Sequence, residues 1–153
     1  MALIIITGTP GTGKSTLAIM LKKKGFYRLD LHEHYKEVST GYDRSKKAYD
    51  VDVKRLEKLV RKVVKEHKDV VFDSHVSHLL PKKMVDCCVV LVCSDLKKLE
   101  KRLQERNYSK KKIRENLDAE IFQECLMEAQ ERGFTPVVVD TATVKKKEMI
   151  GFI

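Results

Sequence analysis

Short apolar runs alternate along this chain with segments whose apolar residues recur every three or four positions. The runs cover residues 2–6, 26–29, 70–73, 86–93 and 136–140, and each predicts a β-strand. The segments with helical spacing cover residues 15–24, 52–67, 95–106, 112–132 and 144–150, and each predicts a helix. Strands that alternate with helices favour an α/β fold, in which a mostly parallel sheet is covered on both faces.

Residues at the ends of these segments refine the prediction. Gly25 and Gly133 follow two of the helices and are expected to end them. Ser94 is expected to cap the start of the helix at 95–106. The polar stretch 30–50 contains Gly-Tyr-Asp at 41–43, which predicts a turn. The sequence shows no repeat and no linker, so residues 1–153 are expected to form a single domain.

Residues 8–15 read GTPGTGKS and match the phosphate-binding loop pattern G-x-x-x-x-G-K-[ST] at every fixed position. The match stands between a predicted strand and a predicted helix, which is the context that this loop requires. Gly8, Gly11 and Gly13 let the backbone approach a phosphate, and their N–H groups offer partial positive charge together with the helix N-terminus. The alternative is a glycine-rich turn that binds nothing. The complete motif in its context instead predicts a nucleoside triphosphate site.

The side chains that follow the glycines have distinct expected roles. Lys14 is expected to reach the β- and γ-phosphates, the Ser15 hydroxyl to ligate Mg²⁺, and Thr16 to support the turn. The Mg²⁺ shell also needs an acidic group at the end of a neighbouring strand. Asp73 ends the run at 70–73 and is the candidate, acting through a water molecule.

His75 lies two residues after Asp73, so both side chains can reach one pocket. A neutral imidazole there would orient water or a phosphate, or relay a proton. The alternative is a loop histidine without a role. His75 is therefore a candidate catalytic residue.

Arg102 and Arg106 are four residues apart at the end of a predicted helix and share one face. They precede a short polar break, where a lid would carry arginines onto a triphosphate. The alternative is that both are ordinary surface cations.

Acidic residues and threonines at other strand ends suggest where substrates are held. Asp140 ends the last predicted strand, and Thr141 follows it in a loop that is well placed to cover an adenine. Asp30 and Asp43 lie where a second substrate would be held. The histidines have HxH and HxxH spacings at 32–34 and 75–78, but no cysteine or acidic partner completes a tetrahedral zinc set.

The net charge of +9 points to anionic partners, namely a nucleotide, RNA or an RNA-bound protein. The alternative is a solvated lysine-rich surface. Few aromatic residues stand among the lysine runs, which disfavours direct stacking on single-stranded RNA. The four cysteines have no CxxC spacing. Cys87, Cys88 and Cys93 fall in or next to an apolar strand and are expected to be reduced core thiols. No apolar run has the length of a membrane span and the first residues do not resemble a signal peptide, so the protein is expected in the cytoplasm.

Four segments together resemble the adenylate kinase isoenzyme 6 family, also called coilin-interacting nuclear ATPases. They are GTPGTGKST at 8–16, GYD at 41–43, VFDSHVSHLLP at 71–81 and RLQERNYSKKKIRENLDAEIFQ at 102–123. The phosphate-binding loop is common to very many proteins, whereas the last two segments are far more specific. The resemblance covers nearly the whole chain.

The resemblance implies a three-layer P-loop fold of the nucleoside monophosphate kinase type. Its sheet would have five parallel strands, with a monophosphate-binding region at about 30–60 and a short lid at about 106–112. It further implies transfer of a phosphoryl group from ATP to AMP, hydrolysis of ATP, and action with a platform ribosomal protein of the small subunit during rRNA maturation. Contact with pre-rRNA and an additional nuclear location, if the source is eukaryotic, belong to the same expectation.

The resemblance also implies roles for matching residues. Gly8, Gly11, Gly13, Lys14, Ser15 and Thr16 would bind phosphates and Mg²⁺. Asp73 and His75 would be the acidic and histidine pair linked to hydrolysis and to the assembly function. Arg106, with Arg102, would supply the lid cations.

One departure from adenylate kinases concerns the acceptor. They usually carry an arginine on the first helix of the monophosphate-binding region, and here that segment reads LHEHYKEV at 31–38. His34 and Lys36 are the candidates there, and neither offers the bidentate fork of an arginine. We therefore expect weaker monophosphate binding and more weight on ATP hydrolysis. A nucleotide-switched assembly factor and a different small-molecule kinase stay open as alternatives.

Overall fold

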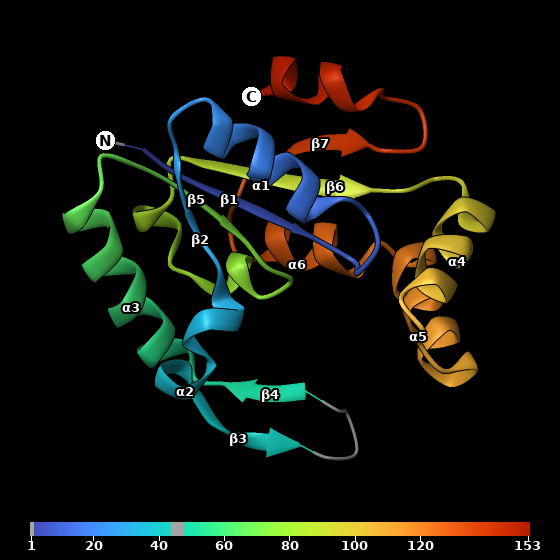
Figure 1. Ribbon diagram of the computed structural model, residues 1–153, viewed down its shortest axis with the longest axis horizontal. Helices are drawn as coiled ribbons and strands as arrows, with labels where there is room; N and C mark the ends of the chain where they lie inside the picture. Colours follow the sequence, from blue (N-terminus) through green and yellow to red (C-terminus); the bar gives the residue numbers. More distant parts are fainter. Residues whose placement is uncertain (1, 44–47) are drawn as a thin grey trace.

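A parallel five-stranded sheet forms the centre of the computed structural model, which describes residues 2–43 and 48–153 (Figure 1). The strands are β1 (Ala2–Gly8), β2 (Tyr27–Leu29), β5 (Asp69–Asp73), β6 (Cys87–Val92) and β7 (Val137–Asp140). Their order across the sheet is β2-β5-β1-β6-β7, and each adjacent pair is parallel. The five predicted strands are confirmed within one or two residues at their ends.

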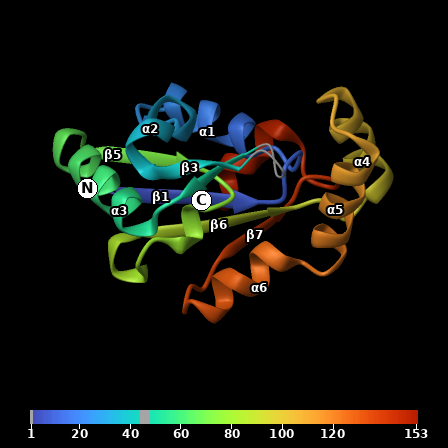
Figure 2. The same ribbon diagram turned by 90° about the horizontal axis from the view of Figure 1, so that it is seen from below.

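Alternate residues of β1 face two separate apolar layers. Leu3 and Ile5 pack with α3 (Val53–Glu66) and α6 (Glu124–Glu131), whereas Ile4 and Ile6 pack with α1 (Lys14–Lys23) and the 3₁₀ helix η4 (Lys146–Phe152). Figure 2 shows α1 and α6 on opposite faces of the sheet. The central strands are therefore buried on both faces, which explains their uninterrupted apolar sequence.

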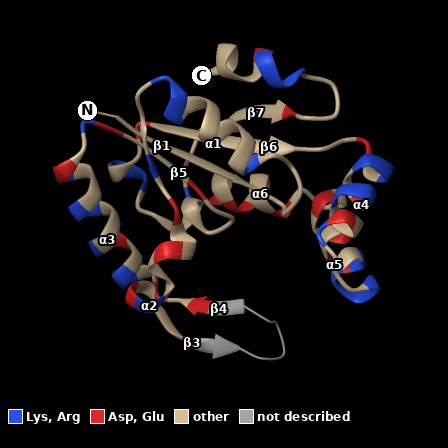
Figure 3. Cartoon of the chain, in the orientation of Figure 1, with Lys and Arg blue, Asp and Glu red and all other residues tan. Residues whose placement is uncertain are grey.

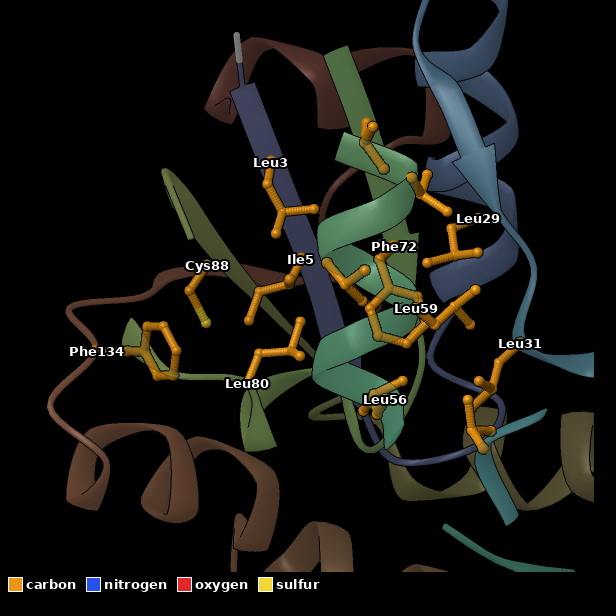
Figure 4. Close-up of a cluster of buried hydrophobic side chains, with 14 of the residues drawn as sticks. Leu3, Ile5, Leu29, Leu31, Leu56, Leu59, Phe72, Leu80, Cys88 and Phe134 are labelled. Carbon is orange, nitrogen blue, oxygen red and sulfur yellow. The ribbon is translucent and has the colours of Figure 1, made fainter. Parts of the chain in front are cut away.

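Helix α3 covers the sheet with residues at helical spacing. Leu56, Leu59, Val60 and Val63 are buried, and Leu56 and Leu59 lie on the same side of the sheet as Ile5 and Phe72 (Figure 4). Asp52 caps the helix by accepting a hydrogen bond from the backbone N–H of Arg55 at 3.1 Å. The predicted helix at 52–67 is thus confirmed.

Two helices lie together beyond the carboxyl ends of β1 and β6 (Figure 1). They are α4 (Leu96–Glu105) and α5 (Lys110–Ile121), and they share a small apolar cluster that includes Leu99, Leu103 and Ile113. The carboxyl ends of parallel strands are where α/β proteins bind ligands. These helices therefore stand beside the edge at which a site is expected.

Three local predictions are wrong. The segment predicted as one helix at 112–132 is broken, because Gln123 has a φ of 51° between α5 and α6. The cap of α4 is Asp95, whose carboxylate accepts hydrogen bonds from the N–H groups of Lys97 and Lys98, and not Ser94. Gly41, predicted in a turn, instead lies in β3 (Ser39–Asp43), which pairs antiparallel with β4 (Ala48–Val51).

Short 3₁₀ and helical turns complete the described chain. They are η1 (Leu31–His34), α2 (Tyr35–Val38), η2 (Ser77–Leu79) and η3 (Lys82–Met84). The final segment, predicted as a helix at 144–150, forms the 3₁₀ helix η4. Across the described residues, no helix is long and apolar enough to cross a membrane.

Candidate nucleotide-binding site

The glycine loop between β1 and α1 has the backbone of a phosphate cradle. Gly8, Gly11 and Gly13 have φ angles of 152°, 89° and 103°, which side chains other than glycine rarely adopt. A Cβ on Gly8 would stand 2.7 Å from the carbonyl oxygen of Leu91, so the loop needs glycine there for space as well. The Thr12 hydroxyl donates to the Thr9 carbonyl at 2.7 Å and closes the turn.

Lys14 lies within this loop. Its Nζ donates to the carbonyl oxygens of Gly8 at 2.8 Å and Thr9 at 3.2 Å. Burial lowers the pKa of Lys14 from 10.5 to about 8, because a charged ammonium is poorly solvated there. A phosphate placed on the loop would supply the negative charge that this ammonium lacks.

Two cavities open on the loop and share Gly11 and Arg106. The smaller cavity, of about 340 Å³, is lined by Gly13, Thr16, Arg102 and Thr141 among others. The larger, of about 750 Å³, is lined by residues that include Lys14, Ser15, Arg28, Asp73 and His75. The loop thus has space for a ligand on each side.

The predicted lid arginines both line the smaller cavity, and Arg102 also contacts the loop. Arg102 donates from Nη1 to the carbonyl oxygen of Gly11 at 3.2 Å and to the hydroxyl of Thr141 at 3.3 Å. Arg106 directly follows α4 and is exposed between the two cavities. Asp140 instead accepts hydrogen bonds from the backbone N–H groups of Ser94 and Ala142, which orders the loop that carries Thr141.

Asp73 forms a bidentate ion pair with Arg28 in the larger cavity. Nε of Arg28 lies 2.9 Å from Oδ1 of Asp73, and Nη2 lies 2.8 Å from Oδ2. The Asp73 side chain is 5% exposed and the Arg28 side chain 21%. The hydrogen bond to this carboxylate raises the pKa of Arg28, which is charged at every physiological pH.

His75 stands on the wall of the same cavity, as predicted. The residue is exposed, but the surrounding protein desolvates the ring, and the positive charge of Lys14 acts in the same direction. Both effects lower the pKa of His75 below its usual value of 6.5. The imidazole is therefore neutral near neutral pH.

Two residues predicted to hold the monophosphate do not line the larger cavity. His34 approaches Glu37 at 3.4 Å, Lys36 is exposed, and neither is among the described residues that line the larger cavity. Asp30 does line it and caps η1 by accepting from the N–H of His32 at 3.0 Å. The side chain of Asp43 lies outside what the structure describes.

Comparison with known proteins agrees with this geometry. A family model described as an AAA domain matches residues 4–123. A putative adenylate kinase from Pyrococcus abyssi is 38% identical over 149 residues, which cover 97% of this chain and 79% of that protein. The adenylate kinase isoenzyme 6 homolog FAP7 of Saccharomyces cerevisiae is 34% identical over 151 residues, covering 96% and 76%. The chain belongs to the adenylate kinase isoenzyme 6 family. The family resemblance of its sequence motifs is thereby confirmed.

Solved structures support the fold of this isoenzyme 6 member. The Bacillus subtilis YorR protein, solved in complex with phosphorylated GDP, superposes with a TM-score of 0.67 at 18% identity, covering 98% of this chain and 92% of YorR. A deoxyadenosine kinase from M. mycoides gives a TM-score of 0.57 at 18% identity, covering 97% and 95%. The predicted three-layer P-loop fold of the nucleoside monophosphate kinase type is confirmed.

Helix α5 and the segment before it contribute cavity residues for which the sequence of this isoenzyme 6 member predicted no role. Tyr108, Lys112 and Asn116 line the larger cavity, and Nζ of Lys112 lies 4.1 Å from the ring centroid of Tyr108. Glu120 follows at the same spacing and is buried behind the loop. Its carboxylate accepts from the Thr9 hydroxyl at 3.2 Å and from the Cys93 N–H at 2.6 Å, and desolvation raises its pKa. Polar residues recur every four positions from 108 to 120, and this pattern in the sequence could have indicated that they share one face.

A second buried polar group supports β1. His78 is 2% exposed, with Nδ1 at 2.9 Å from the Thr7 hydroxyl and Nε2 at 2.7 Å from a carboxylate oxygen of Glu128. Cys88 and Cys93 are buried as predicted, whereas Cys87 and Cys125 are half-buried, and all four thiols are free. The contacts of His78 therefore join β1 to α6.

The donor set near the loop suits Mg²⁺. Ser15 and Asp73 line one cavity, and Mg²⁺ prefers oxygen ligands while retaining several waters. Each Asp73 oxygen accepts one hydrogen bond from Arg28 and keeps a second acceptor direction. Among the described residues no three histidine, cysteine, aspartate or glutamate side chains cluster as a metal site. The arrangement therefore fits an ion carried by phosphates and waters.

Proposed function

We propose that this protein is an adenylate kinase with intrinsic ATPase activity. It would transfer the γ-phosphoryl group of ATP to AMP, and to water when AMP is absent. The observation that carries the proposal is a phosphate-binding loop that opens on two cavities with a shared wall at Gly11 and Arg106. Donor and acceptor would then meet across that wall. Names of relatives as adenylate kinases support the same activity.

The smaller cavity suits the nucleoside part of ATP. The phosphates would lie on the loop from Gly11 to Thr16, with Lys14 at the β- and γ-phosphates. Arg102 and Thr141 line the wall where the adenine and ribose would rest. Mg²⁺ held near Ser15 and Asp73 would neutralise charge on the β- and γ-phosphates.

Phosphoryl transfer asks little covalent chemistry of a protein, so positioning and electrostatics decide the rate. The bond from the γ-phosphorus to the bridging oxygen breaks, a bond to an AMP phosphate oxygen forms, and both products are ADP. Lys14 and Arg106 would stabilise the charge on the transferred group. His75, as a neutral imidazole, would orient the attacking water during hydrolysis.

A second candidate function is a nucleotide-switched assembly factor. The net charge of +9 favours it, and Lys and Arg recur along α3, α4 and α5 (Figure 3). Its partner would be a ribosomal protein of the small-subunit platform, with pre-rRNA as a further contact. A pull-down of that ribosomal protein with and without ATP tests this function.

The deciding experiment is ADP formation from Mg·ATP with and without AMP, dAMP, CMP, UMP or GMP. Selective stimulation by AMP, absent in the Lys14→Ala variant, would establish an adenylate kinase. Slow ADP formation that no monophosphate changes would make ATP hydrolysis the main activity and refute the acceptor role of the larger cavity.

A further inference from the structure

The larger cavity contains an arginine that lies on a strand. Adenylate kinases usually carry such an arginine on the first helix of the monophosphate-binding region. Resting on the function proposed above, we propose that Arg28 binds the phosphate of the acceptor nucleotide. Arg28 lies on β2, next to β5 and therefore beside Asp73. Its side chain is 21% exposed and lines the cavity.

Arg28 has an unused hydrogen-bonding edge. A guanidinium carries five N–H donors, and the pair with Asp73 uses one on Nε and one on Nη2. Nη1 makes no hydrogen bond to any residue that the structure describes. Nη1 and the second N–H of Nη2 form the parallel fork that binds two oxygens of one phosphate.

Asp73 holds this fork in place. The bidentate pair fixes the guanidinium plane, so little side-chain entropy is lost when a phosphate binds. Asp73 itself is almost fully buried, and Arg28 is the more exposed member of the pair. Both residues line the cavity, and Arg28 offers it the more exposed side chain.

Two other cations of the cavity already have contacts within the protein. Lys14 contacts the loop carbonyls, and Lys112 lies over the ring of Tyr108. Lys14, Arg28, Arg106 and Lys112 together outnumber Asp30 and Asp73 among the charged lining residues other than histidine. The cavity thus attracts a phosphate dianion, and Arg28 is the cation that β2 supplies to its wall.

The test measures the dissociation constants of AMP and of adenosine by calorimetry for the wild type, Arg28→Lys and Arg28→Gln. Loss of a bidentate charged contact should weaken AMP binding by about ten- to a hundredfold in Arg28→Gln, with a smaller loss in Arg28→Lys. Adenosine binding should change little, because adenosine lacks the phosphate. Arg114→Gln is the matched control, since Arg114 pairs with Asp118 on the exposed side of α5.

The double variant Arg28→Gln/Asp73→Asn separates direct binding from an indirect effect. If Arg28 binds the phosphate, AMP affinity stays low in the double variant. Recovery of affinity would show that the single variant failed because Asp73 was left unpaired, and would overturn the proposal. Equal AMP binding by wild type and Arg28→Gln would overturn it too, while leaving the kinase function intact. A wild type that binds no AMP would refute that function itself.

Discussion

Lys14 shows how burial of one side chain sets the conditions for nucleotide binding. Its pKa of about 8 in the free protein means that the ammonium loses its proton within the range of ordinary assays. Phosphates favour the protonated form, so binding should raise this pKa again. The interaction is therefore strongest on the acid side of that value.

We predict that ATP affinity falls as the pH rises through about 8, and that binding takes up a proton above that pH. Calorimetry in two buffers of different ionisation enthalpy measures the uptake. Lys14→Arg stays charged and should lose both effects, whereas Lys23→Arg, at the exposed end of α1, should behave as the wild type. A proton uptake that survives in Lys14→Arg would assign it to another group.

His75 permits a test of catalysis that is separate from binding. We predict that His75→Asn slows ATP hydrolysis by about tenfold or more while the dissociation constant of ATP changes by less than about twofold. The reason is that the ring stands on the wall of the cavity proposed for the acceptor and not on the phosphate-binding loop. Parallel loss of affinity and turnover would contradict this role.

Motifs and strand ends were enough to locate Lys14, Asp73 and His75 in the sequence. Arg28 was not predicted as a site residue, because its contact with Asp73 joins positions 45 residues apart. Their strands, β2 and β5, are neighbours in the sheet but not in the sequence. A three-residue strand such as β2 offers no pattern that reveals this. Contacts between strands follow from their order, which periodicity along the chain does not encode.

At the scale of elements, α5 links the loop to the wall of the larger cavity. Lys112 and Asn116 line the cavity, and Glu120, one turn further on, holds the loop through Thr9 and the start of the segment after β6 through Cys93. A displacement of α5 would therefore also move the phosphate-binding loop, through the hydrogen bond between Glu120 and Thr9.

We predict that Glu120→Ala lowers the free energy of unfolding by about 1–3 kcal/mol, because it leaves the buried Cys93 N–H and Thr9 hydroxyl without their acceptor. Glu115→Ala, at an exposed position of the same helix, should change it by less than about 0.5 kcal/mol. Urea denaturation measures both. Equal effects of the two substitutions would show that Glu120 does not anchor the loop.

The break between α5 and α6 marks a limit of helical periodicity. Leu117 lies before the break and Leu126 after it, and the two residues pack in different apolar clusters. The interruption arises from the left-handed backbone of Gln123, a residue type that seldom signals it. Ser94 was likewise a plausible cap, but the carboxylate of Asp95 reaches two N–H groups from the next position.

At the scale of the molecule, the sheet and its two covering layers form a framework whose binding edge carries both cavities. The alternation of apolar runs predicted these layers correctly, because strands buried on both faces must be apolar throughout. A ligand that binds at this edge stabilises only the folded state, because the unfolded chain has no formed phosphate-binding site.

We predict that ATP at 100 times its dissociation constant raises the free energy of unfolding by about 2.7 kcal/mol. The increase should vanish in Lys14→Ala, whose ammonium no longer meets the phosphates. Urea denaturation with and without ATP provides the measurement. An unchanged increase in Lys14→Ala would place the stabilising nucleotide away from the loop.

Gly11 and Arg106 belong to the walls of both cavities, so we expect the two proposed ligands to influence each other's binding. Their dissociation constants are then joined by a thermodynamic cycle. If a donor nucleotide tightens the hold on AMP by some factor, AMP must tighten the hold on the donor by the same factor. A substitution at Arg106 that changes this factor must change it equally from either direction.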